Sequence, residues 1–190
     1  MPQTDPPHAP EQPARRALVR HPAFIGGEGL ALQADAERTA AGRLRLRYRL
    51  TGRLAGVRLP EPAEPERADE LWRHTCFEAF LAGPDGYLEF NFAPSRRWAA
   101  YRFTGYRSGM VVADLPPPEI EVREAPDRFE LDALLDLSRA GLPDGPWSAS
   151  LTAVVEAADG AISYWALVHP TGKPDFHHPD SFVLSLPAPA

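Results

Sequence analysis

The sequence predicts an all-β domain, a two-sheet antiparallel sandwich of the jelly-roll type with at most one short helix. Roughly ten short segments have the composition and the apolar-polar alternation of strands. Proline is concentrated between these segments, where it cannot interrupt a hydrogen-bonded ladder. A helical pattern is confined to one stretch, residues 133–142. Many short strands with glycine and proline turns are typical of sandwiches.

The clearest strand is RLRLRYRL, residues 43–50. Its apolar residues and its arginines alternate without error, which predicts a half-buried antiparallel strand with one face toward water. The stretch ALLDLSRAGL, residues 133–142, is the one candidate helical turn and ends at Gly141. The other predicted strands are residues 28–35, 73–82, 87–93, 97–105, 119–124, 128–134, 148–157, 161–169 and 181–186.

The chain is predicted to form one domain. Its 190 residues include 22 prolines, several of them in the first sixteen residues. We therefore expect a disordered proline-rich arm at residues 1–16, a single β-sandwich domain at 17–187 and a short tail at 188–190. Residues 59–70, LPEPAEPERADE, are expected to form an exposed acidic loop.

The overall charge limits the class of partner. There are 26 acidic and 20 basic residues, a formal net charge of −6, which argues against a surface for nucleic acid or anionic membrane and favours a small polar ligand. The sequence has no apolar signal region and no apolar run of the roughly 20 residues that span a membrane. With Cys76 as its single cysteine, we expect a cytoplasmic protein.

The segment FEAFLAGPDGYLEFNF, residues 77–92, permits a register prediction. If GPDG is a hairpin loop, Ala82 faces Tyr87. The pairs Phe77 with Phe92, Ala79 with Phe90 and Leu81 with Leu88 then form one apolar row, while Glu78 with Asn91 and Phe80 with Glu89 occupy the other face.

A second loop, PSRR at residues 94–97, would pair Ala93 with Trp98 and Glu89 with Arg102. The second face of this three-stranded sheet would then collect Glu78, Glu89, Asn91, Trp98 and Arg102, with Trp72 if the strand extends that far. Aromatic rings cover the apolar face of a sugar, and carboxylate, amide and guanidinium groups bind its hydroxyls. The ordinary alternatives are a Glu89–Arg102 cross-strand ion pair, an ion pair of Glu78 with Arg73, Arg97 or Arg102, and tryptophans that simply pack.

The segments LWRHTCFEAFLAGPDGYLEFNFAPSRRWAAYRF and SYWALVHPTGKPDFHHPDSFVLSL together resemble DOMON-like proteins related to family-9 carbohydrate-binding modules. The resemblance implies a β-sandwich that binds sugar between two tryptophans. It implies that Trp72 is one wall, that Glu78 accepts hydrogen bonds, and that Asn91 and Arg102 are polar partners. The second family tryptophan is replaced here by KPDFHHP, residues 173–179, which leaves Phe176 as the nearest aromatic residue.

Other site predictions remain open beside the sugar site. A haem-binding branch of the same superfamily implies haem b between Met110 and His169, with His74 as a third candidate ligand. The side chains of His177 and Asp180 in DFHHPD suit a first-row metal, although a loop fixed by Asp and His hydrogen bonds is the better explanation of the segment. The resemblance also implies that the loops could bind calcium. A third class of function, beside sugar binding and haem binding, is a protein-interaction module without a small ligand.

No catalytic motif is present: the sequence lacks GxSxG, HExxH and a glycine-rich phosphate loop after a strand. The predicted register makes Glu78 and Glu89 diagonal neighbours and puts Arg102 beside Glu89, where it would keep that carboxylate ionised. We therefore expect a non-catalytic protein that binds a carbohydrate or a glycosylated small molecule on the concave face of the sheet.

Overall fold

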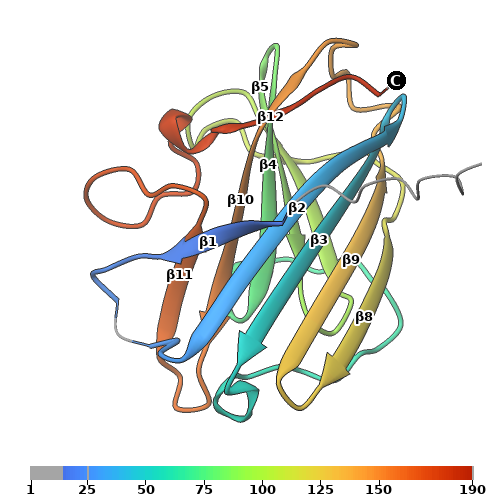
Figure 1. The fold of residues 1–190 in the computed structure, drawn as a ribbon. Helices are drawn as coiled ribbons and strands as arrows, with labels where there is room; N and C mark the ends of the chain where they lie inside the picture. Colours follow the sequence, from blue (N-terminus) through green and yellow to red (C-terminus); the bar gives the residue numbers. More distant parts are fainter. Residues whose placement is uncertain (1–14, 25, 190) are drawn as a thin grey trace, which may run out of the picture.

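The computed structural model describes residues 15–24 and 26–189, and these residues form a single curled antiparallel sheet of twelve strands (Figure 1). The strands are β1 (Arg16–Arg20), β2 (Leu30–Ala40), β3 (Arg43–Gly52), β4 (Cys76–Gly83), β5 (Gly86–Phe92), β6 (Trp98–Phe103), β7 (Val111–Val112), β8 (Glu119–Ala125), β9 (Arg128–Asp136), β10 (Trp147–Glu156), β11 (Ile162–Ala166) and β12 (Leu184–Leu186). Three 3-10 turns are present in these residues: η1 (Leu54–Gly56), η2 (Leu71–Arg73) and η3 (Pro179–Ser181).

The sheet folds over on itself into two layers. Its strand order is β7-β6-β5-β4-β10-β11-β1-β2-β3-β9-β8, with β12 paired to β10. In Figure 1, β2, β3, β9 and β8 form the front layer and β4, β5 and β10 lie behind them. Strand β1 pairs with β11 on one side and β2 on the other, so it joins the layers. The predicted all-β sandwich is thus confirmed.

The core between the layers is apolar and aromatic. Phe77 of β4 lies between Tyr48 and Phe129 of the other layer, with ring centroids 5.2 and 5.6 Å away. All three side chains are buried, as are the leucines of the RLRLRYRL strand. The Tyr48 hydroxyl donates a 2.7 Å hydrogen bond to the Glu78 carbonyl, which satisfies the one polar atom of that ring inside the core.

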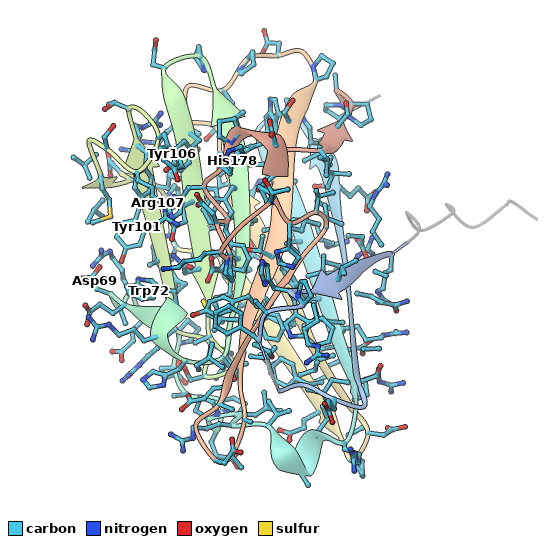
Figure 2. The ribbon with its side chains drawn as sticks, turned by 90° about the vertical axis from the view of Figure 1, so that its left-hand side faces the viewer. Asp69, Trp72, Tyr101, Tyr106, Arg107 and His178 are labelled. Carbon is cyan, nitrogen blue, oxygen red and sulfur yellow. The ribbon has the colours of Figure 1, made fainter. Side chains whose placement is uncertain are left out.

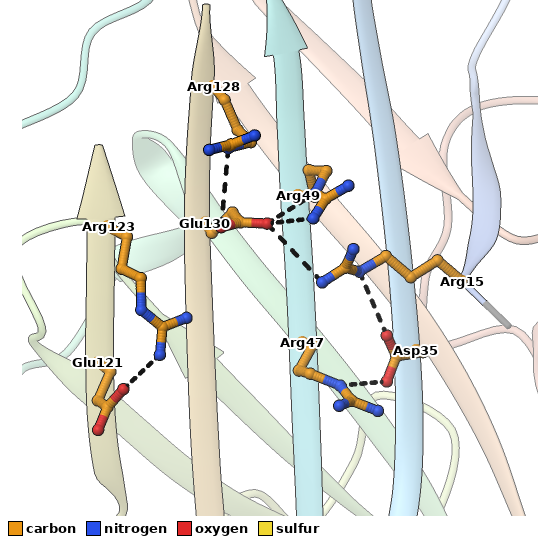
Figure 3. A network of polar contacts seen from close by, with 8 residues as sticks. All are labelled: Arg15, Asp35, Arg47, Arg49, Glu121, Arg123, Arg128 and Glu130. Atoms are coloured by element: carbon orange, nitrogen blue, oxygen red, sulfur yellow. Dashed lines mark hydrogen bonds and ion pairs between the residues drawn. The ribbon is translucent and has the colours of Figure 1, made fainter. Parts of the chain in front are cut away.

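The outer surface of the front layer is a lattice of ion pairs (Figure 3). Arg47 of β3 lies 2.7 Å from Asp35 of β2, and Arg49 lies 2.6 Å from Glu130 of β9. Arg15 reaches both carboxylates. The arginines of the alternating strand therefore face water beside acids from neighbouring strands, which explains that alternation without a binding role.

Several element predictions are corrected. Residues 133–136 continue β9 rather than starting a helix, because their two-residue alternation buries Ala133 and Leu135 against β3. Strands β1 and β7 were not predicted, and β4 begins at Cys76 rather than at residue 73. Most of the predicted arm, residues 1–14, lies outside the described residues, and β1 begins at the arm's last residue, Arg16.

The register of the first hairpin is confirmed. Phe77 pairs with Phe92, Glu78 with Asn91 and Phe80 with Glu89, as the sequence predicts. Gly86 closes the turn with a φ of 125°, and a Cβ at this position would lie 1.9 Å from the Phe103 carbonyl oxygen. Only glycine fits this position, both because of its positive φ and because β6 approaches it closely.

The register of the second hairpin is wrong by one residue. Phe92 pairs with Trp98 and Glu89 with Tyr101, because the connection is a five-residue loop in which the Ala93 amide bonds the Arg97 carbonyl at 2.9 Å. Arg96 in this loop adopts a left-handed φ of 69°. A shift of one residue exchanges the faces of a strand, so every side chain of β6 lies on the side opposite to the predicted one.

Candidate functional site

A cavity of about 740 Å³ lies on the outer face of the second layer, the face turned away from the core. Its floor crosses β4, β5, β6, β10 and β11 and includes Glu78, Glu89, Tyr101, Val154 and Tyr164. This volume is within the range of about 300–1,000 Å³ typical of small-molecule sites.

The cross-strand rows of this face explain where the cavity forms. Strand pairing aligns Ala166, Thr152, Glu78, Asn91 and Ala99 in one row. Apart from Glu78 these side chains are small, while the adjacent rows carry large rings such as Tyr164 and Tyr101. Because the side chains of this row are shorter than those of the rows on either side, there is room for a ligand above Glu78.

Loops build the walls of the cavity. The turn η2, which precedes β4, contributes Trp72, whose side chain remains 49% exposed. The segment between β11 and β12 contributes Lys173, Pro174 and Phe176, and the loop after β6 contributes Arg107. Figure 2 shows Asp69, Trp72, Tyr101 and Arg107 together on this flank of the molecule. The complete lining is Phe24, Asp69, Glu70, Trp72, Glu78, Glu89, Tyr101, Phe103, Arg107, Met110, Val154, Tyr164, Lys173, Pro174, Phe176 and His177.

Glu78 is the most unusual group of the floor. Its side chain is 3% exposed, and its Oε1 atom has no hydrogen-bond partner within the described residues. Burial raises its pKa well above the ordinary glutamate value, and the nearby Glu89 carboxylate raises it further. An uncompensated buried carboxylate is costly, so burial favours the protonated form of Glu78 in the empty site.

Glu89 is buried beside it but better supported. The Asn91 amide donates a 2.7 Å hydrogen bond to Glu89 Oε1, and Asn91 Oδ1 lies 3.6 Å from the Cys76 thiol. Burial raises the pKa of Glu89, while this hydrogen bond and the charge of Arg107 lower it. Of the two acids, Glu78 is therefore the one that holds the proton.

Hydrogen bonds tie the walls to the floor. The Tyr101 hydroxyl donates a 2.6 Å hydrogen bond to Asp69 of the loop before η2, and burial together with this carboxylate raises the pKa of Tyr101. Arg107 lies 2.8 Å from Asp175, which also accepts hydrogen bonds from the Tyr106 hydroxyl and the His177 amide. The two loops are thus joined across one side of the cavity.

His177 fills the space between the aromatic rows. Its ring contacts Phe80, Tyr87 and Phe103 with centroids 5.2 to 5.7 Å apart, and its Nδ1 lies 2.7 Å from the Tyr87 hydroxyl. Burial lowers its pKa to about 4, so the imidazole is neutral near pH 7. The 3.9 Å approach of His177 Nε2 to Glu89 is for this reason not an ion pair at that pH.

The structure brings together part of the predicted sugar site. Trp72, Glu78 and Phe176 line the cavity, and Asn91 is fully buried behind it as the partner of Glu89. Trp98 belongs to the core cluster on the other face, and the Arg102 guanidinium bonds the Ala140 carbonyl at 2.6 Å. The predicted placement of Trp98 and Arg102 on the site face is wrong, because it rested on the shifted register.

The predicted arginine partners of Glu78 are also absent from its surroundings. Arg73 pairs with Glu70 and Arg97 with Glu66, both near the surface. The ion-pair explanation of Glu78 is therefore wrong for the described residues, and so is the expectation that Arg102 keeps Glu89 ionised.

The predicted haem ligands do not meet. Met110 lines the cavity, whereas His169 is absent from the lining and its Nε2 lies 2.8 Å from the Val19 carbonyl oxygen. The third candidate, His74, bonds Glu156 at 2.8 Å.

The predicted metal ligands also separate. His177 bonds Tyr87, while the Asp180 carboxylate lies on the surface 3.7 Å from His178. Among the residues that the structure describes, no group of three or more His, Cys, Asp or Glu side chains is arranged around a common ion position. The expected loop of Asp and His hydrogen bonds is confirmed by the Asp175 and His178 contacts.

Sequence reasoning missed several lining residues. Tyr101 and Phe103 were assigned to the wrong face by the shifted register, and Asp69 was assigned to a solvated loop. Phe24 and Tyr164 come from segments far away in the sequence, and no local pattern relates them to Glu78. One sequence signal was available for two of these residues. Tyr101 and Phe103 are two positions apart in β6, so they lie on the same face of the strand.

Fold and cavity together define a class: an antiparallel β-sandwich with an aromatic-lined cavity on one outer face. No protein-family model matches the chain, and the search of curated proteins found no match. Among solved structures, the chain is similar to a carbohydrate binding module family 9 (CBM9) from Caldicellulosiruptor kristjanssonii in complex with cellotriose. The TM-score is 0.56 at 10% identity, over 93% of this chain and 82% of that one.

A CBM9 structure from the same organism, in complex with glucose, gives a TM-score of 0.54 at 10% identity over 87% of this chain and 80% of the other. At such identity the similarity establishes the fold, and the chain has the β-sandwich fold of these modules. The closer resemblance to DOMON-like proteins remains a prediction. In the described part of the chain, no helix has the length and apolar composition needed to cross a membrane.

Proposed function

We propose that this chain is a non-catalytic binding protein that holds a carbohydrate in the cavity above Glu78. One observation carries the proposal: a buried carboxyl group without a partner lies at the bottom of an aromatic-lined cavity. A sugar offers apolar C–H faces to the rings and several hydroxyl donors to the acid, which matches both features.

Trp72 supports this reading by its position. It lies at the rim, half exposed, although a tryptophan gains about 1.5–3 kcal/mol or more by full burial. Phe176 and Pro174 line the same cavity and provide further apolar surface. The fold similarity to carbohydrate-binding modules, one of which is described in complex with cellotriose, adds independent support.

Calorimetric titration with glucose and cellotriose tests the proposal. We expect saturable binding by the intact chain and a loss of about tenfold in affinity for Trp72→Ala, because ring stacking contributes about 1 kcal/mol or more. The matched control is Val183→Ala, which truncates a similarly exposed apolar side chain outside the cavity and should bind normally.

Two results would contradict the proposal. One is the absence of binding heat for every neutral and charged sugar of a panel at millimolar concentration. The other is full affinity in Trp72→Ala, which would move the site away from the cavity.

A further inference from the structure

Acidic side chains lie at the floor of the cavity, and basic side chains lie nearer its rim. Glu78 and Glu89 lie buried at the floor, whereas Lys173 is exposed at the rim and Arg107 is paired with Asp175. The rim acids also have cationic partners, since Asp69 pairs with Arg67 and Glu70 with Arg73. Within the described residues, the floor carboxyls therefore face the cavity without a cationic side chain of their own.

The titratable and charged groups around Glu78 come from every neighbouring element. They are Cys76 on β4, Glu89 on β5, Tyr101 on β6, Tyr164 on β11, Asp69 and Glu70 before η2, Arg107 after β6, and Lys173 and His177 before β12. Asn91 Nδ2 donates to Glu89, whereas Glu78 Oε1 has no donor within the described residues. The hydroxyl of Thr152, the cross-strand neighbour of Glu78, also has no partner there.

We infer that the cavity selects an amino sugar, whose protonated amine lies against Glu78 and Glu89; this inference rests on the proposed carbohydrate function. A neutral hydroxyl gives the protonated Glu78 one hydrogen bond and places no positive charge beside Glu89. An ammonium group gives up to three hydrogen bonds and compensates the negative charge. Aromatic rings beside an organic cation add a cation–π attraction, and Tyr101 and Tyr164 border this position.

A protonation step follows from the same geometry. In the empty site Glu78 holds a proton because it is buried beside Glu89. An arriving ammonium favours the carboxylate form, so Glu78 releases its proton to solvent as the amine binds. A neutral sugar leaves Glu78 protonated, and its binding is not coupled to proton release.

Calorimetry with matched sugars tests the inference. Glucose, 2-amino-2-deoxyglucose and its N-acetyl derivative differ at one carbon, and the β-1,4-linked trimer of the amino sugar matches cellotriose in length. At about pH 6.5, where the amine is protonated, we expect each amino sugar to bind about tenfold tighter than its hydroxyl counterpart, with no gain for the N-acetyl form. Titrations in two buffers of different ionisation enthalpy should show proton release for the amino sugars.

Variants separate the outcomes. Glu78→Gln, nearly isosteric, should abolish the amino-sugar preference and the proton release, while Glu121→Gln, on the outer surface of the other layer, should keep both. Should Glu78→Gln fail to fold, Glu89→Gln is expected to reduce the preference in the same direction. Equal or weaker binding of the amino sugars than of glucose, or a preference that survives Glu78→Gln, overturns the inference and leaves the carbohydrate function intact. Absence of binding by all five sugars overturns both.

Discussion

Replacing Glu78 by glutamine should change how the stability of the empty protein depends on pH. An unfolded glutamate loses its proton near pH 4.5, whereas burial and the Glu89 carboxylate raise the pKa of folded Glu78 well above that value. Between these two pKa values, the folded protein binds one proton more than the unfolded chain. Stability must therefore fall as the pH rises through this range, and the loss persists above it.

The size of the effect follows from the number of protons. One extra bound proton changes the free energy of unfolding by about 1.4 kcal/mol for each pH unit. Glutamine has nearly the same shape and cannot ionise, so Glu78→Gln removes this slope. We expect wild type and variant to be similarly stable near pH 4, and the variant to become progressively more stable toward pH 8.

Urea unfolding followed by far-UV circular dichroism at a series of pH values measures this difference. Other groups with shifted pKa values, such as Asp35 and Asp175, contribute to both proteins and cancel in the difference curve. Glu121→Gln is the control, because it removes an exposed carboxylate from the opposite layer. Parallel curves for wild type and Glu78→Gln would refute the reasoning, since Glu78 would then ionise at the same pH in both states.

Three further predictions concern the surroundings of the site. Asp175→Asn should cost about 1 kcal/mol of stability and weaken sugar binding, because it loses the ion pair with the half-exposed Arg107 that joins two walls. Urea unfolding and calorimetry on one sample test both parts, and unchanged affinity would contradict the role of the walls. Phe77→Ala should cost about 3–5 kcal/mol in urea unfolding yet leave sugar affinity within about twofold, since Phe77 faces the core; a large loss of affinity in folded protein would count against this. Haem added to the protein should give no saturable Soret band, because His169 lies outside the cavity that Met110 lines; a band that disappears in His169→Ala would contradict this.

The first hairpin could be predicted because its sequence is unambiguous. The GPDG turn requires glycine at a specific position, and each strand has distinct apolar and polar faces around Glu78. A slip of one residue would have buried Glu78 in the core between the layers, so the pattern admits one register.

The second hairpin could not be predicted in the same way. The strand WAAYRF has aromatic residues on both faces, so either register gives an aromatic pair. The predicted register pairs Phe90 with Tyr101, and the observed one pairs Phe92 with Trp98. The observed register requires Arg96 to adopt a left-handed φ. This conformation is expected at glycine or asparagine, and an arginine gives no indication of it in the sequence. This single backbone torsion decides that Tyr101 rather than Arg102 faces the cavity.

The cavity forms where the cross-strand row of mostly small side chains around Glu78 is enclosed by loop segments, which have no strand pattern in the sequence. Alternation places Glu78 on the outer face, but the exposure of that face depends on whether a loop covers it. The segment before β12 covers the rows of Phe80 and Phe103 with His177 and stops short of Glu78, where the lining remains open as a cavity. A buried acid is tolerated at that point because the neighbouring space can admit a donor, so the unpaired carboxyl and the cavity are two consequences of one arrangement.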